Sequence, residues 1–244
     1  MLQGPAYLAR GFRLMWQPGV RPFVVVPLLI NIATVVALFL WLWPMLQTMV
    51  AGWLALLPGW LSWLEFLVWP LLWIFGLLIF CLMLTVLANL IASPFNGFLA
   101  ARVEQHLTGI LPDSGLSLWQ EGLQGLLMEL RKLLFFASRA IPLALLSLVL
   151  FFIPGLNALI PVLWMLFGAY MLALEYTDYP ASNHGLSFAQ KRKSLSRHRW
   201  LGLGFGATVT LVTAIPLANL LVMPAAVAGA TALWVEYLQK ETSA

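Results

Sequence analysis

The segment Gly19-Val20-Arg21 combines residues that could bind an anion, and it comes directly before a long apolar stretch. A helix that begins there exposes unpaired backbone N–H groups and the positive end of its dipole. Gly19 allows a ligand to approach the backbone closely, and Arg21 adds a guanidinium group. The combination predicts a site for a small oxyanion such as sulfate or phosphate. The alternative is that Arg21 only anchors the first span at the cytoplasmic face.

A second set of candidates consists of asparagines at membrane depth or at breaks between helices. They are Asn31, Asn89, Asn96, Asn157 and Asn219. Burying an amide in hydrocarbon without a partner is costly, so each of these side chains needs another polar group or water. A neutral lining that donates hydrogen bonds suits a pore for an anion that must be released again. The alternative is hydrogen bonding between helices, as in other membrane bundles.

Acidic residues near the ends of two broken apolar stretches form a third set. They are Glu175, Asp178 and Glu236, and the cations expected to pair with them are Arg102, Arg139 and Arg199. Carboxylates at such depth either close ion pairs or relay protons. Ion pairing is the favoured interpretation, and proton coupling is the alternative.

The residue sets typical of enzymes do not occur in the sequence. It has no Gly-x-Ser-x-Gly, no His-Glu-x-x-His and no lysine in a phosphate-binding glycine loop. Cys81 is the single cysteine, and the three histidines are scattered, so neither a disulfide nor a Cys/His metal spacing is possible within one chain. We therefore expect no enzymatic activity, no cofactor and no metal.

Helices that cross or enter a membrane must position these candidates. The stretches 22–64, 66–101, 140–174 and 200–235 carry no charged residue. Each exceeds the ~20 apolar residues that an α-helix needs to cross ~30 Å of hydrocarbon. With 62% hydrophobic and 9% charged residues, the chain is expected to be an all-α integral membrane protein. The net charge of +4 is explained by cations kept at the cytoplasmic face, not by nucleic-acid binding.

The cations also predict the topology. They flank every uncharged stretch except around residues 45–65, so this segment is predicted outside and both termini inside the cytoplasm. The last two stretches then enter and leave by the same face, and Pro154-Gly155 and Pro216 break them into short arms. We expect two helical hairpins that penetrate the bilayer only partly; six thin crossings in total are the alternative. Matching broken segments also point to a transport site.

The predicted organisation is a single membrane domain of residues 1–244. Its parts are an interfacial segment (1–21), two long transmembrane spans (22–101), a cytoplasmic amphipathic helix region (102–139), a first broken hairpin (140–176), a basic cytoplasmic loop (177–199) and a second broken hairpin (200–237). Residues 1–21 lack a small-residue cleavage site after a short apolar core, so we expect no cleaved signal peptide.

Several segments resemble the CysZ family of bacterial sulfate permeases. They are Gln17-Pro18-Gly19-Val20-Arg21-Pro22-Phe23, Val26-Pro27-Leu28-Leu29-Ile30-Asn31, the run 89–100 (NLIASPFNGFLA), Phe152-Ile153-Pro154-Gly155, Asp178-Tyr179-Pro180, Asn183-His184, Ile215-Pro216-Leu217-Ala218-Asn219-Leu220 and Gly229-Ala230-Thr231-Ala232. These segments cover nearly the whole chain in the family's order, which makes the resemblance specific.

The resemblance implies an inner-membrane protein that supplies sulfate to the pathway making cysteine. It also implies an oligomer, and a fold of two long transmembrane helices with two partly penetrating hairpins. The family's sulfate site, a Gly-x-Arg-Arg turn, carries over to Gly19, Val20 and Arg21. Pro22 stands where the family has its second arginine, and the backbone N–H of Phe23 is expected to contribute in its place.

The expected function is therefore uptake of sulfate, together with sulfite and related oxyanions, across the bacterial inner membrane. The sequence has no ATP-binding motif, so transport is passive, ion-coupled or driven by another subunit. A channel-like route lined by the asparagines is the first expectation, and proton coupling through Glu175 or Glu236 is the second. The alternative function is a non-transporting accessory or structural protein of a separate transporter.

Overall fold

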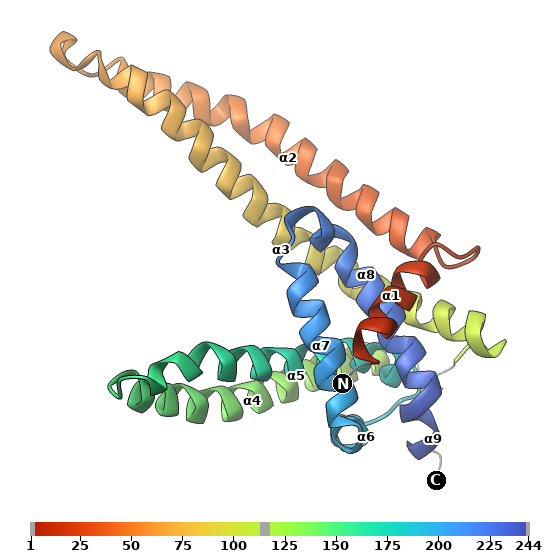
Figure 1. Ribbon diagram of the computed structural model, residues 1–244. Helices are drawn as coiled ribbons and strands as arrows, with labels where there is room; N and C mark the ends of the chain where they lie inside the picture. Colours follow the sequence, from red (N-terminus) through yellow and green to blue (C-terminus); the bar gives the residue numbers. More distant parts are fainter. Residues whose placement is uncertain (1–2, 113–117, 243–244) are drawn as a thin grey trace. The chain divides into compact units, whose positions relative to one another are not determined.

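The computed structural model describes residues 3–112 and 118–242, except for the side chains of residues 81–82, 84–94, 118–126, 128–129, 216–220 and 241–242 (Figure 1). All regular elements in this part of the chain are helical. Among the described residues, four helical segments are long and apolar enough to cross a membrane: Pro22–Leu54, Leu130–Phe151, Leu156–Ser182 and Leu221–Leu238. The predicted fold class, an all-α integral membrane protein, is confirmed.

The helices follow one another in chain order as α1 (Gly4–Leu14), α2 (Pro22–Leu54), α3 (Leu64–Thr108), α4 (Leu118–Phe151), α5 (Leu159–Ser182), α6 (Phe188–Arg197), α7 (Arg199–Thr213), α8 (Pro216–Leu233) and α9 (Gln239–Thr242). Three short helical elements lie between them: η1 (Gly59–Leu61), η2 (Leu156–Ala158) and η3 (Trp234–Leu238), the last of which is a π-helix. The chain forms two compact units, one of residues 22–95 and one of residues 1–21 with 96–244.

The unit of residues 22–95 is a long helical hairpin of α2 and the first part of α3. Aromatic rings hold its two arms together: Phe39 packs edge-to-face on Phe80 at 5.3 Å, and the ring centroids of Trp43 and Trp73 are 4.1 Å apart. Gly76 makes room for Trp43, whose ring lies 2.6 Å from the position of a Cβ atom there. Since most of the other described side chains on both arms are exposed and apolar, this unit presents a lipid-compatible surface.

The other unit is built on close contacts between helix backbones. Helix α1 packs on α8 and α7, and α5 packs on α7 and α8. A Cβ atom at Gly11 of α1 would overlap the carbonyl oxygen of Ala225 on α8, and one at Gly206 of α7 would overlap that of Ala169 on α5. Small residues let membrane helices approach in this way, so that van der Waals contact drives their association.

Two helices continue across boundaries predicted from the sequence, and a third continues through an internal proline. Helix α2 passes through Pro44 to Leu54, and α3 continues past residue 101 to Thr108. Helix α4 crosses the predicted boundary at residues 139 and 140. A helix that ends in hydrocarbon leaves backbone groups without hydrogen-bond partners, and the free-energy cost of this exceeds that of a proline inside the helix. Helix α2 therefore continues through Pro44.

The breaks expected in the two hairpins are present. Helices α4 and α5 are separated around Pro154 and Gly155, where Gly155 has a φ of 85°, and α8 begins at Pro216. The predicted basic loop of residues 177–199 instead contains the end of α5 and all of α6. The reason is a capping box, in which Ser187 and Gln190 satisfy the first backbone N–H groups of α6. The depth of the hairpins and the single-domain organisation stay predictions.

We predict that Gly206→Ala lowers the thermal unfolding midpoint of the detergent-solubilised protein. The added methyl group would force α7 away from Ala169, at a cost of about 1–3 kcal/mol for overpacking. The control is Gly168→Ala on α5, where a Cβ atom would meet nothing within 4 Å. Because alanine favours a helix by about 1 kcal/mol over glycine, the control should leave the midpoint unchanged or raise it. Equal midpoints for both variants would contradict the packing described.

Candidate functional site

The predicted anion-binding segment is a tight turn. The backbone N–H groups of Val20 and Arg21 both donate to the carbonyl oxygen of Gln17, at 3.0 and 3.1 Å. Gly19 has a φ of 84°, in the left-handed region that favours glycine. The Val20 side chain is buried and the Arg21 side chain is exposed. The turn therefore uses two of its own N–H groups internally and presents the Arg21 guanidinium outward.

Phe23 lies half-buried in the first turn of α2. The proline before it fits this place, because the first N–H groups of a helix have no intrahelical acceptor. The sequence-based argument for a positive helix end at this position therefore agrees with where α2 begins.

Of the three predicted asparagines whose side chains the structure describes, two are buried. Asn31 is 3% exposed and Asn96 is 4% exposed. Within the part of the chain that the structure describes, Asn31 Oδ1 and Asn96 Nδ2 have no hydrogen-bond partner. Asn157 is exposed beside the break between α4 and α5, whereas the side chains of Asn89 and Asn219 lie outside the described residues. A buried amide atom without a partner is the arrangement expected where water or a ligand completes the bonding.

A network of buried charges joins α4, α5 and α6. Lys132 Nζ lies 3.0 Å from Glu175 and 3.3 Å from Asp178, and Lys191 Nζ lies 2.7 Å from the other oxygen of Asp178. Lys191 also donates to the Ser182 hydroxyl at 2.6 Å. Both lysine side chains are almost fully buried, at 4% and 3% exposed. Two buried ammonium groups are thus neutralised by Asp178, which is 12% exposed, and by Glu175, which is 33% exposed.

Glu236 forms a separate pair with α1. Its carboxylate accepts hydrogen bonds from the Arg10 guanidinium and the Tyr7 hydroxyl. Burial raises the pKa of Tyr7 above its usual value, and the hydrogen bond to Glu236 raises it further. Tyr7 therefore stays protonated and can act as the donor. The pair fastens the N-terminal helix to η3 near the end of the chain.

Glu104 forms the core of a third polar group. Its side chain is 3% exposed, one oxygen lies 2.7 Å from His184 Nε2, and Gln239 Nε2 donates to the same oxygen at 3.2 Å. The second oxygen, Oε2, has no partner among the described residues. The His184 ring also packs on Trp234, with centroids 5.8 Å apart. In the described ranges, no cluster of three His, Cys, Asp or Glu is placed to hold a metal ion.

Comparison with known proteins places this arrangement in a family. The family model described as "Sulfate transporter CysZ/Etoposide-induced protein 2.4" matches residues 7–224. The chain belongs to this family. The protein named "Sulfate transporter CysZ" from Pectobacterium atrosepticum is 44% identical over 236 residues, which are 96% of this chain and 84% of that relative. The resemblance inferred from the sequence motifs is confirmed.

The family match includes the turn at Gly19 and the network around Lys132, whereas Glu236 lies beyond its end. The structure corrects the cations assigned to the acids. Arg10, Lys132 and Lys191 neutralise them, whereas the cations predicted from the sequence lie elsewhere. Arg102 donates to Gln105 at 2.9 Å, Arg139 lies 5.5 Å from the Phe135 ring centre, and Arg199 lies 5.6 Å from that of Trp200. Partners so distant in sequence depend on how the helices pack.

Sequence reasoning also missed Glu104. The signal was available in its spacing, because Leu99, Ala100 and Val103 are buried on the same helix and Glu104 shares their side. An acid on the buried side of a helix needs a partner. Predicting that the helix continues to Thr108 would have placed Glu104 on that buried side.

We predict that Lys132→Met destabilises the protein by about 1–3 kcal/mol, because it removes a buried cation that contacts both Glu175 and Asp178, while Lys191 still pairs with Asp178. The measurement is the free energy of unfolding in detergent micelles titrated with a denaturing detergent. The control is Arg131→Met, which removes a positive charge from the preceding residue. Because Arg131 is exposed, this substitution should change the free energy of unfolding by less than about 0.5 kcal/mol. Equal effects of the two substitutions would show that the network is energetically unimportant.

Proposed function

We propose that this protein takes up sulfate across the bacterial inner membrane and so supplies sulfate assimilation and cysteine biosynthesis. The observation that carries the proposal is the 44% identity, over 96% of the chain, to a relative named as a sulfate transporter. Four apolar helical segments among the described residues support a multi-pass membrane protein. In this proposal both termini are cytoplasmic, the protein works as a homo-oligomer in contact with lipid, and it is not an enzyme.

Sulfate binds first at the turn of Gly19, Val20 and Arg21. The exposed guanidinium of Arg21 supports this role, since an arginine forms strong charge-assisted hydrogen bonds with an oxyanion. The left-handed Gly19 leaves open space at this point, with no atom within 4 Å of a built Cβ atom. Val20 and Arg21 use their own N–H groups to close the turn, so the Arg21 guanidinium is the group offered to the anion. Phe23, in the first turn of α2, stays a candidate from the sequence.

The route through the protein is channel-like and lined by amides. Two buried amides support this, because Asn31 Oδ1 and Asn96 Nδ2 each lack a hydrogen-bond partner in the described structure. Asn89, Asn157 and Asn219 remain candidates from the sequence. Neutral donors stabilise an anion without holding it as tightly as a cation would, which permits release.

The carboxylates serve as ion-pair partners in this mechanism. Glu175 is bound to Lys132, and Glu236 is bound to Arg10 and Tyr7. These partners support ion pairing, and not proton transfer, as the role of both carboxylates. In this proposal transport follows the sulfate gradient, with no proton step at these groups.

We predict that liposomes containing only this protein take up radioactive sulfate, and that Arg21→Ala raises the half-saturating concentration about ten-fold. The reason is the loss of a hydrogen bond to a charged group, which contributes about 1.5 kcal/mol. The matched control is Arg13→Ala, which removes an exposed cation from α1 and should leave the half-saturating concentration unchanged.

Uptake no higher than in empty liposomes, with or without a proton gradient, would instead assign the protein an accessory role. Uptake that Arg21→Ala and Arg13→Ala weaken equally would reduce Arg21 to a topology anchor.

We also predict that sulfate uptake responds to an inward proton gradient in the same way in Glu175→Gln, in Glu236→Gln and in the unmodified protein. The physical reason is that both side chains act through ion pairs, so their loss affects stability and not coupling. The measurement is the initial uptake rate with and without the gradient, normalised to the amount of folded protein. Loss of a gradient response in either variant would identify that carboxylate as a proton carrier.

A further inference from the structure

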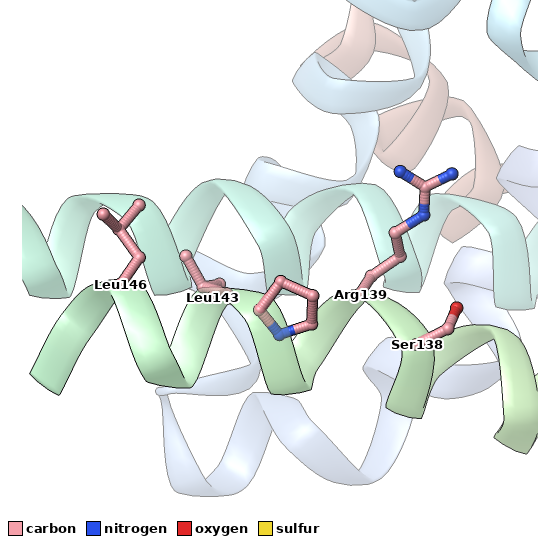
Figure 2. A pocket seen from close by; sticks show the side chains of 5 residues that line it. Ser138, Arg139, Leu143 and Leu146 are labelled. Carbon is pink, nitrogen blue, oxygen red and sulfur yellow. The ribbon is translucent and has the colours of Figure 1, made fainter.

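An open groove of about 550 Å³ runs along α4, next to the first broken hairpin (Figure 2). The residues that line it are Ser138, Arg139, Pro142, Leu143 and Leu146. In Figure 2 the Leu143 and Leu146 side chains lie along one side of α4, and the guanidinium of Arg139 projects from that side. The groove therefore has a charged end followed by an apolar length.

A second guanidinium lies near the charged end. Arg192 on α6 lies 5.1 Å from the centre of the Phe135 ring, and Arg139 lies 5.5 Å from the same centre. The ring itself is held edge-to-face against Phe188 at 5.6 Å. Both arginines also act electrostatically on the hydroxyl of Tyr170 on α5. Two positive charges from different helices thus contact the same ring, and one of them, Arg139, lines the groove.

The groove lies at a boundary in the sequence. Arg139 is the last charged residue before the uncharged stretch 140–174. The apolar side chains that follow on α4 are strongly exposed; Ile141, Leu145 and Leu148 are 59%, 61% and 59% exposed. Since such a surface requires hydrocarbon around it, Arg139 lies where the hydrocarbon ends and the phospholipid headgroups begin.

We propose that this groove is a binding site for an anionic phospholipid. Arg139 and Arg192 bind the phosphate of the headgroup, and one acyl chain lies along Pro142, Leu143 and Leu146. Guanidinium groups match phosphate oxygens in geometry and charge, and basic pockets between membrane helices are suited to anionic headgroups. Ser138 contributes little, because its hydroxyl already donates to the Phe135 carbonyl at 2.7 Å. The site is distinct from the Gly19 turn and does not depend on the proposed transport route.

To test this, the full chain is reconstituted in vesicles with equal amounts of phosphatidylglycerol and phosphatidylethanolamine. The lipids that stay bound to the protein are then counted by native mass spectrometry. We expect preferential retention of phosphatidylglycerol. Arg139→Gln should lower this preference about five-fold, which corresponds to about 1 kcal/mol for one cation beside an anionic headgroup. Adding Arg192→Gln should lower it further. Ser138→Ala and Arg131→Gln, which removes an exposed cation outside the groove, should leave the preference unchanged.

Four results would overturn the proposal. The first three are equal retention of both lipids, an equal loss of preference in Arg131→Gln, and displacement of the lipid by millimolar free sulfate, which would make the groove a site for a soluble anion. The fourth is a disulfide between two copies that carry Arg139→Cys, formed in protein that retains no lipid, because it would show that two copies of the chain meet at the groove. A salt titration of the unmodified protein gives a test without substitutions, because added salt should weaken the preference for phosphatidylglycerol.

Discussion

Asp178 receives two buried ammonium groups, Lys132 from α4 and Lys191 from α6, and the arrangement of the first hairpin depends on this contact. Removing any one of these ions from water costs several kcal/mol unless an opposite charge and hydrogen bonds replace the water. The helices can therefore bury these residues only in the orientation that brings all three together. The charges thus determine how α4, α5 and α6 meet, although apolar contacts supply most of the packing.

Close backbone contact at small residues determines how the N-terminal helix α1 packs on its neighbours. Helix α1 contacts α8 at Gly11 and α7 at Gly4, and Glu236 holds it through Tyr7 and Arg10. Met15 and Val20, which follow α1, are almost completely buried. The turn that carries Arg21 is therefore attached to a rigid base, and an anion meeting it would not have to order a mobile segment.

The sequence predicted the features that depend on local composition. The uncharged stretches, the breaks at Pro154 and Pro216, and the family followed from residue type and order. Helix ends were less predictable, because α3 and α4 both cross the boundaries that the charged residues indicated. The pairing of Glu175 with Lys132 and of Glu104 with His184 joins residues far apart in the chain, and only the packing of helices brings them together.

The length of α2 has a consequence for the membrane around it. Its 33 residues correspond to about 50 Å, whereas the hydrocarbon core of a bilayer is about 30 Å thick. No charged residue occurs along the helix, so the excess cannot extend into water without exposing apolar side chains. This hydrophobic mismatch requires a strong tilt of the helix or a locally thicker bilayer. The orientation of the hairpin of α2 and α3 is consequently tied to acyl-chain length, and lipids with longer chains would allow it to stand more upright.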